Sequence, residues 1–117
     1  MTYVTILGST GAIGTRTLEV LAALGDTYQV AGLAAGRNVE LLAEQICRFH
    51  PQIVAVADEE SRARLLSLLD RSDAPEVLVG DEGLIACASL PAPVVVNAVM
   101  GARGILPALA AVRRGLV

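Results

Sequence analysis

Two kinds of pattern alternate along the 117 residues of the chain. Short runs rich in β-branched residues are each followed by a longer segment whose apolar residues recur at helical spacing. Strands that alternate with helices in this way predict an α/β fold, in which one doubly wound parallel sheet carries helices on both faces. The predicted strands cover residues 3–7, 28–34, 53–57, 76–79 and 93–98, and the predicted helices cover residues 12–24, 38–49, 59–69, 81–89 and 105–114.

The helix boundaries follow from residues that favour helix ends. Asn38 and Asp58 each stand directly before a helical segment, where their side chains can accept hydrogen bonds from backbone N–H groups. Pro51 ends the second helix, and His50 is expected at its C-terminus. The apolar positions expected to face the sheet are Ile13, Leu18, Leu21 and Leu24 in the first helix and Leu41, Leu42 and Ile46 in the second.

A glycine-rich segment joins the first predicted strand to the first predicted helix. It reads Gly8-Ser9-Thr10-Gly11-Ala12-Ile13-Gly14. Glycines permit a tight turn and a close approach of the backbone to an anion, while the helix N-terminus offers unpaired N–H groups and a partial positive charge. A strand, a glycine turn and a helix in this order predict a Rossmann-like domain that holds the pyrophosphate of a dinucleotide. The alternative is a turn that merely connects strand and helix, because the spacing is G-x-x-G-x-x-G rather than G-x-G-x-x-G.

The segment after the second strand indicates which dinucleotide is bound. Enzymes that use NAD place a carboxylate near the end of this strand to bind the 2′-hydroxyl of the adenosine ribose. Here the strand leads into Gly36-Arg37-Asn38 and carries no carboxylate. An arginine binds phosphate well, and Asn38 can add an amide donor, so these residues predict NADPH. The alternatives are an ordinary solvated arginine and an asparagine that only caps the helix.

The composition excludes several other functions. The chain has no lysine, which excludes a Schiff-base lysine, a Walker A loop and the Tyr-x-x-x-Lys pair of short-chain dehydrogenases. The net charge of −3 gives no attraction to nucleic acid or to an anionic membrane. No signal peptide and no apolar stretch of membrane-spanning length is visible, so a cytoplasmic protein is expected. Cys47 and Cys87 are expected to be small core residues.

Three segments together resemble one known family. Residues 7–14, residues 35–39 (Ala-Gly-Arg-Asn-Val) and residues 100–111 (Met-Gly-Ala-Arg-Gly-Ile-Leu-Pro-Ala-Leu-Ala-Ala) are similar to the start of 1-deoxy-D-xylulose 5-phosphate reductoisomerase. The resemblance implies an enzyme that isomerises 1-deoxy-D-xylulose 5-phosphate and reduces it with NADPH to 2-C-methyl-D-erythritol 4-phosphate, in non-mevalonate isoprenoid biosynthesis. It also implies a divalent metal (Mg, Mn or Co) and a homodimer for the full-length enzyme.

The resemblance also implies site residues. Cofactor contacts fall on Thr10, Gly11, Ile13 and the segment Gly36-Arg37-Asn38. Two positions depart from the family pattern, since Ala12 replaces the usual serine and Arg37 stands where lysine is frequent. Ala12 keeps its backbone N–H, and either cation suits a phosphate. Residues 1–117 are therefore expected to form the NADPH-binding domain.

The last residues suggest a fragment. Arg113-Arg114-Gly115 resembles a helix end with its glycine cap, and Leu116 and Val117 resemble the opening of another strand. The family's Leu-Ala-Asn-Lys-Glu-Ser-Leu-Val segment, its metal ligands and its lid are expected beyond this point. No catalytic or metal-binding residue is therefore predicted within the chain, which is expected to bind NADPH without turnover. Two alternatives stay open: another G-x-x-G-x-x-G reductase, such as one similar to aspartate-semialdehyde dehydrogenase, and a non-catalytic NADP-binding sensor.

Overall fold

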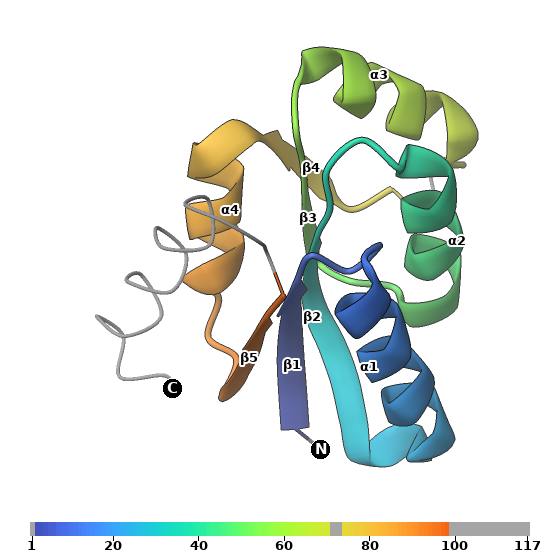
Figure 1. Ribbon diagram of the computed structural model, residues 1–117, viewed down its shortest axis with the longest axis vertical. Helices are drawn as coiled ribbons and strands as arrows, with labels where there is room; N and C mark the ends of the chain where they lie inside the picture. Colours follow the sequence, from blue (N-terminus) through green and yellow to red (C-terminus); the bar gives the residue numbers. More distant parts are fainter. Residues whose placement is uncertain (1, 71–73, 99–117) are drawn as a thin grey trace.

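A computed structural model describes residues 2–70 and 74–98 of the chain. Five parallel strands form one sheet in the order β4-β3-β2-β1-β5 (Figure 1). The strands are β1 (Thr2–Leu7), β2 (Tyr28–Ala34), β3 (Ile53–Val56), β4 (Glu76–Val79) and β5 (Val94–Asn97). The predicted α/β class and the predicted parallel sheet are confirmed.

The helices cover both faces of this sheet. Helices α1 (Ala12–Ala23), α2 (Val39–Phe49) and α3 (Glu59–Leu68) pack on one face, and α4 (Gly80–Ala88) packs on the other (Figure 1). The chain steps in one direction from β1 to β4, and right-handed crossovers then place α1, α2 and α3 on the same side. It reverses direction to reach β5 beside β1, which places α4 on the opposite face. The sheet is therefore doubly wound, as predicted.

Each face of the sheet has its own apolar core. Strand residues such as Val4, Ile6 and Leu33 pack against α1, α2 and α3. On the opposite face, smaller strand residues lie against α4, with Leu7, Ala34, Ala55, Leu84, Cys87 and Ala88 forming the second cluster. Burial on both faces explains why the strands are continuous apolar runs rather than alternating patterns.

The predicted helix caps are present. Asn38 Oδ1 accepts a hydrogen bond from Leu41 N–H at 3.3 Å, and Asp58 Oδ1 accepts one from Ser61 N–H at 2.8 Å. His50 ends α2 in the left-handed conformation with φ of 50°, where its N–H donates to Ile46 O. The residue choices at these helix ends thus fix the loops at both ends of α2.

Three predictions about buried apolar residues were wrong. Ile13 is 66% exposed, because it lies in the first turn of α1, beyond the end of β1. Leu24 is also exposed, since α1 ends at Ala23 and Leu24 only caps it. Cys47 is exposed, because it lies at the open hollow between α2 and α3 and not against the sheet.

Cys87 is buried as predicted, and desolvation raises the pKa of its thiol to about 12, so the group stays protonated. Helix α4 begins at Gly80, one residue before its predicted start. The predicted turn at 100–104 and the predicted helix at 105–114 lie outside the described residues.

Gly14 allows α1 to approach the end of β1 closely. A Cβ atom at Gly14 would lie 2.7 Å from Ser9 Cα and 2.9 Å from Gly8 C, and closer still to Gly8 O. All three contacts are with backbone, so no side chain can move aside. At Gly36, by contrast, a Cβ would meet no atom within 4 Å.

These two glycines give a matched pair of stability variants. We expect Gly14→Ala to lower the free energy of unfolding by about 3 kcal/mol, because the added methyl group overpacks a rigid backbone contact. We expect Gly36→Ala to change it by less than about 0.5 kcal/mol. Urea denaturation of both variants beside the parent chain measures the difference. If both variants lost the same free energy of unfolding, the close backbone contact at Gly14 would not be the cause of the loss.

Candidate cofactor-binding site

The strand order creates a crevice at one edge of the sheet. Strands β1 and β5 are neighbours, but the chain leaves β1 for α1 on one face of the sheet and reaches β5 from α4 on the other, so the strand order reverses at their carboxyl ends and forms a topological switch point. Ala98 N–H donates to Leu7 O at 2.8 Å, which keeps the two strand ends together. Ligands of open α/β sheets bind at such a point. The glycine segment follows β1 directly and therefore lies at this edge.

The turn formed by Gly8 and Ser9 is held on the end of β2. Gly8 has φ of 85°, a conformation that a side chain disfavours, and its N–H donates to Ala34 O at 2.7 Å. The N–H of Ser9 donates to the same carbonyl oxygen at 2.9 Å. Gly11 N–H then closes the turn on Gly8 O at 3.2 Å. The turn is therefore fixed by backbone atoms before any ligand arrives.

The N-terminus of α1 is the one helix start among the described residues that has no acidic residue in its first turn. The other three α-helices carry Glu40, the pair Glu59 and Glu60, or the pair Asp81 and Glu82 at that place. Gly11 caps α1 without a side-chain hydrogen bond, and the first N–H groups of a helix have no intrahelical acceptor. The positive end of the helix dipole is thus left uncompensated, which suits an anion.

An open hollow of about 370 Å³ lies at this helix start. Six residues line it, namely Thr10, Gly11, Ala12, Thr15, Arg16 and Glu19. Thr10, Gly11 and Ala12 are among the predicted cofactor contacts, and exposed Ile13 follows them. Ser9 and Gly14 are buried, and the N–H groups of Gly8 and Ser9 are used within the protein. The geometry therefore divides the predicted segment into residues that face the hollow and residues that support it.

The predicted 2′-phosphate segment lies at the carboxyl end of the neighbouring strand β2. Gly36, Arg37 and Asn38 are all exposed, and the Arg37 side chain is 82% accessible. Asn38 uses its side-chain oxygen to cap α2, which leaves the amide nitrogen as a donor. Because the protein does not fill the space at Gly36, a ligand can approach the backbone there.

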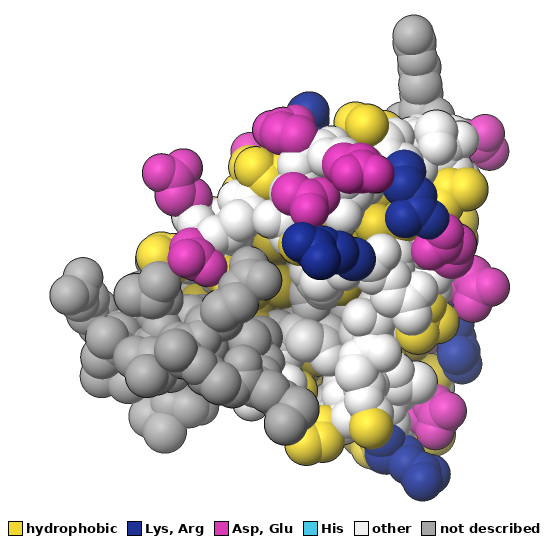
Figure 2. Space-filling model, turned by 45° about the horizontal axis from the view of Figure 1, so that its top comes forward, with side chains coloured by type: hydrophobic (Ala, Val, Ile, Leu, Met, Phe, Trp, Pro, Cys, Tyr) yellow, Lys and Arg dark blue, Asp and Glu magenta, His cyan; other side chains and the backbone are white. Residues whose placement is uncertain are grey.

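The structure adds Asp58, which sequence reasoning treated only as a helix cap. Its Oδ2 lies 3.4 Å from Arg37 Nε, so a carboxylate from the end of β3 pairs with the cation at the end of β2. Hydrogen bonds from Ser61, and then the Arg37 guanidinium, hold the pKa of this carboxyl below its usual value. Parallel strands end at one edge, so the neighbouring positions of Arg37 and Asp58 could have suggested this pair. Figure 2 shows acidic and basic side chains interspersed on this side of the molecule.

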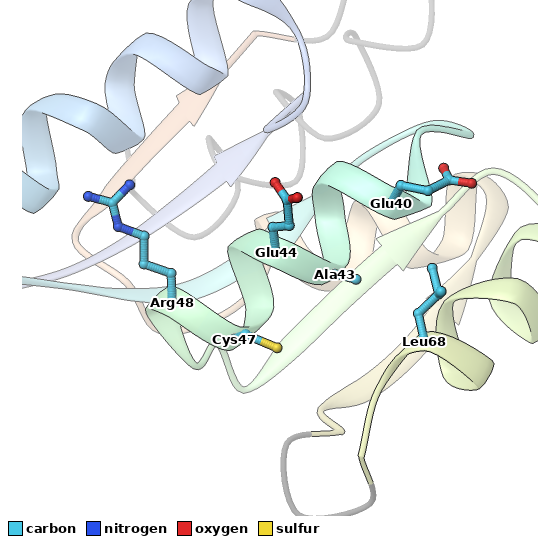
Figure 3. Close-up of a pocket in the computed structure, with 6 residues that line it drawn as sticks. All are labelled: Glu40, Ala43, Glu44, Cys47, Arg48 and Leu68. Atoms are coloured by element: carbon cyan, nitrogen blue, oxygen red, sulfur yellow. The ribbon is translucent and has the colours of Figure 1, made fainter.

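A larger hollow of about 570 Å³ lies between α2 and α3, away from the glycine segment. Figure 3 shows its lining residues, Glu40, Ala43, Glu44, Cys47, Arg48 and Leu68. It touches none of the residues at the ends of β1 and β2 discussed above. We therefore place the candidate site at the crevice rather than in the larger hollow, because the uncapped start of α1 and the exposed Arg37 follow the ends of neighbouring strands there.

Among residues 2–70 and 74–98, no group of three or more His, Cys, Asp or Glu side chains could hold a metal ion. In the same part of the chain, no helix combines the length and apolarity needed to cross a bilayer.

The comparisons with known proteins agree with this geometry. A model of the family 1-deoxy-D-xylulose 5-phosphate reductoisomerase matches residues 4–117. The reductoisomerase of Gloeobacter violaceus is 49% identical over 117 residues, and that of Synechococcus sp. (strain JA-2-3B'a(2-13)) is 48% identical over the same length. Each alignment covers 98% of this chain but only 30% of the relative, so the chain spans about 30% of the length of these proteins.

Solved structures show the same relationship. A reductoisomerase from Zymomonas mobilis in complex with NADPH superposes with a TM-score of 0.91 at 34% identity, covering 98% of this chain and 30% of that one. Another reductoisomerase, in complex with NADPH, fosmidomycin and magnesium, gives a TM-score of 0.91 at 31% identity, covering 99% of this chain and 29% of that one. The chain therefore belongs to the 1-deoxy-D-xylulose 5-phosphate reductoisomerase family.

Proposed function

We propose that this chain is the NADPH-binding domain of an enzyme that isomerises and reduces 1-deoxy-D-xylulose 5-phosphate to 2-C-methyl-D-erythritol 4-phosphate. The observation that carries the proposal is the N-terminus of α1, which stands at the switch point without an acidic residue in its first turn. Family membership supports the reaction, and the relatives solved with NADPH support the cofactor.

The residues that follow β1 are assigned to the pyrophosphate of the cofactor, and the residues that follow β2 are assigned to its 2′-phosphate. The backbone N–H groups of Thr10, Ala12 and Ile13 are directed to the pyrophosphate, and Ala12 needs no hydroxyl for this. Gly11 N–H is used within the turn, where it donates to Gly8 O, so Gly11 contributes by letting the ligand come close to the backbone. Arg37 and Asn38 bind the 2′-phosphate through the guanidinium and the free amide nitrogen. The bound cofactor supplies the hydride for the reduction.

Metal binding and the catalytic residues are assigned to the part of the relatives' length that this chain does not span. A related structure contains magnesium, and such an ion requires several oxygen ligands. The consecutive acids Glu59 and Glu60 instead start α3, and Asp81 and Glu82 start α4, where they complement the helix dipoles. We further propose a cytoplasmic location, which the free cysteines Cys47 and Cys87 fit, and a homodimer for the full-length enzyme.

A single substitution at the start of α1 tests pyrophosphate binding. We expect Ala12→Asp to keep or raise stability, by roughly 0.3–1 kcal/mol, because an acid in the first turn complements the helix dipole. The same carboxylate would repel the pyrophosphate, so affinity for NADPH should fall at least about tenfold, a cost of about 1.4 kcal/mol. Isothermal titration calorimetry and urea denaturation measure the two quantities.

Ala63→Asp serves as the matched control for that variant. Ala63 is exposed on α3, so the substitution adds the same charge far from the glycine segment along the chain. It should leave the affinity for NADPH within about twofold of the parent. If Ala12→Asp bound NADPH as tightly as the parent, the pyrophosphate would not bind at this helix start.

The preference for NADPH over NADH tests Arg37. We expect Arg37→Gln to weaken NADPH binding about tenfold, because it removes a charge-assisted hydrogen bond of roughly 1.5 kcal/mol. NADH lacks the 2′-phosphate, so the affinity of Arg37→Gln for NADH should stay within about twofold of the parent. Arg37→Glu should reduce the difference between the affinities for NADPH and NADH further. Arg64→Gln is the control, since Arg64 is an exposed arginine on α3 that pairs with Glu40. A parent chain that binds both cofactors equally well would contradict the assignment.

The reaction itself can be tested with a chimera. This chain would replace the matching 117 residues of the Gloeobacter violaceus reductoisomerase, to which it is 49% identical. We expect the chimera to oxidise NADPH when given 1-deoxy-D-xylulose 5-phosphate and magnesium, and the 117-residue chain alone to bind NADPH without turnover. A folded chimera that binds NADPH but does not react would favour a non-catalytic NADP-binding role.

A further inference from the structure

A polar side chain interrupts the apolar face of α2. Val39, Leu42 and Ile46 on this face are fully buried, and Gln45 lies among them with only 6% of its surface exposed. Its Nε2 donates a hydrogen bond of 2.8 Å to the carbonyl oxygen of Ser9, 36 residues earlier in the chain. This bond joins α2 to the glycine segment that precedes α1.

Burying this amide costs free energy that an apolar side chain at the same place in the core would not cost. Gln45 Oε1 is buried and has no hydrogen-bond partner among the described residues. An apolar side chain of similar size, such as methionine, would fill the same volume without burying an unsatisfied oxygen of its own. The one bond that the amide does make is therefore the feature that distinguishes glutamine here from an ordinary core residue.

The carbonyl that receives this bond has little other support. Ser9 is completely buried, and the other donor to its carbonyl oxygen is Thr15 Oγ1, at a long 3.4 Å. Loss of the Gln45 bond would leave a buried acceptor poorly satisfied. The peptide between Ser9 and Thr10 would then be free to rotate toward another partner.

The orientation of this peptide determines where its N–H points. No described peptide bond is cis, and in a trans peptide the C=O and N–H groups point in opposite directions. Because Ser9 C=O points toward Gln45, Thr10 N–H points away from α2. Thr10 N–H donates to no backbone acceptor among the described residues, and Thr10 lines the hollow at the start of α1.

We propose that Gln45 is a positioning residue for cofactor binding, which fixes the Ser9–Thr10 peptide so that Thr10 N–H is directed at the pyrophosphate. This inference rests on the proposed function, since it needs a dinucleotide in the crevice. The pyrophosphate is common to NADPH and NADH. Gln45 therefore supports both cofactors equally, unlike Arg37, which acts on the 2′-phosphate alone.

Gln45→Met separates this role from simple packing, because it removes the donor and keeps the length of the side chain. We expect it to raise the dissociation constants of NADPH and NADH by a similar factor of about five to twenty in the 117-residue chain. The matched control is Ile46→Val, which trims the adjacent buried residue and leaves the hydrogen bond intact. Both variants should lower the melting temperature, but only Gln45→Met should weaken binding.

A measurement on the cofactor-free chain keeps this inference distinct from the proposed function. Backbone order parameters from NMR relaxation should fall at Thr10 and Gly11 in Gln45→Met and stay unchanged in Ile46→Val. If the parent chain binds neither cofactor, the proposed function fails. If Gln45→Met keeps the parent's order parameters, or if both variants lose affinity by the same factor, Gln45 is a core residue and the positioning role is overturned.

Discussion

The close contact between the first turn of α1 and the end of β1 is the constraint on which the rest of the site depends. A Cβ at Gly14 would lie 2.7 Å from Ser9 Cα, so the helix can start this near to the sheet only with a glycine at that position. A tight start directs the first N–H groups of α1 at the crevice beside the switch point, instead of at solvent above it. The positive φ of Gly8 and the hydrogen bonds to Ala34 O follow from the same short turn.

Charge is distributed over the helix starts in a way that matches this geometry. Helices α2, α3 and α4 compensate their N-termini with acidic residues, and α2 and α3 add side-chain caps from Asn38 and Asp58. Helix α1 has neither device, although every helix start gains stability from them. Helix α1 lacks a stabilisation that the neighbouring helix starts at the same sheet edge have. A locally unfavourable choice of this kind is typical of a binding site. An anionic ligand would supply the missing charge.

Much of this arrangement could be predicted from the sequence, because it depends on residues that are near one another along the chain. The alternation of strands and helices predicted the sheet, and Asn38 and Asp58 predicted two caps. The contacts that sequence reasoning missed join residues distant along the chain. The pair between Arg37 and Asp58 requires β2 and β3 to be neighbours, and the bond between Gln45 and Ser9 requires α2 to pack beside the glycine segment. The sequence does contain one signal for Gln45, which lies three residues after Leu42 on a helix face that is otherwise apolar.

The exposure of Ile13 has a related cause, since helical periodicity assigns a residue to a face but does not say where the sheet beneath it ends. The glycine turn after β1 and the segment after β2 are both connected to the carboxyl end of β2. The carbonyl oxygen of Ala34 holds the N–H groups of Gly8 and Ser9, and Ala34 is also the last residue of β2, two residues before Gly36. The turn proposed for the pyrophosphate and the segment proposed for the 2′-phosphate are therefore built on the same fully buried strand end. Because both segments are anchored at Ala34, we expect the sheet to set the spacing between the two proposed phosphate sites, and the side chains of Arg37 and Gln45 to act on one site each.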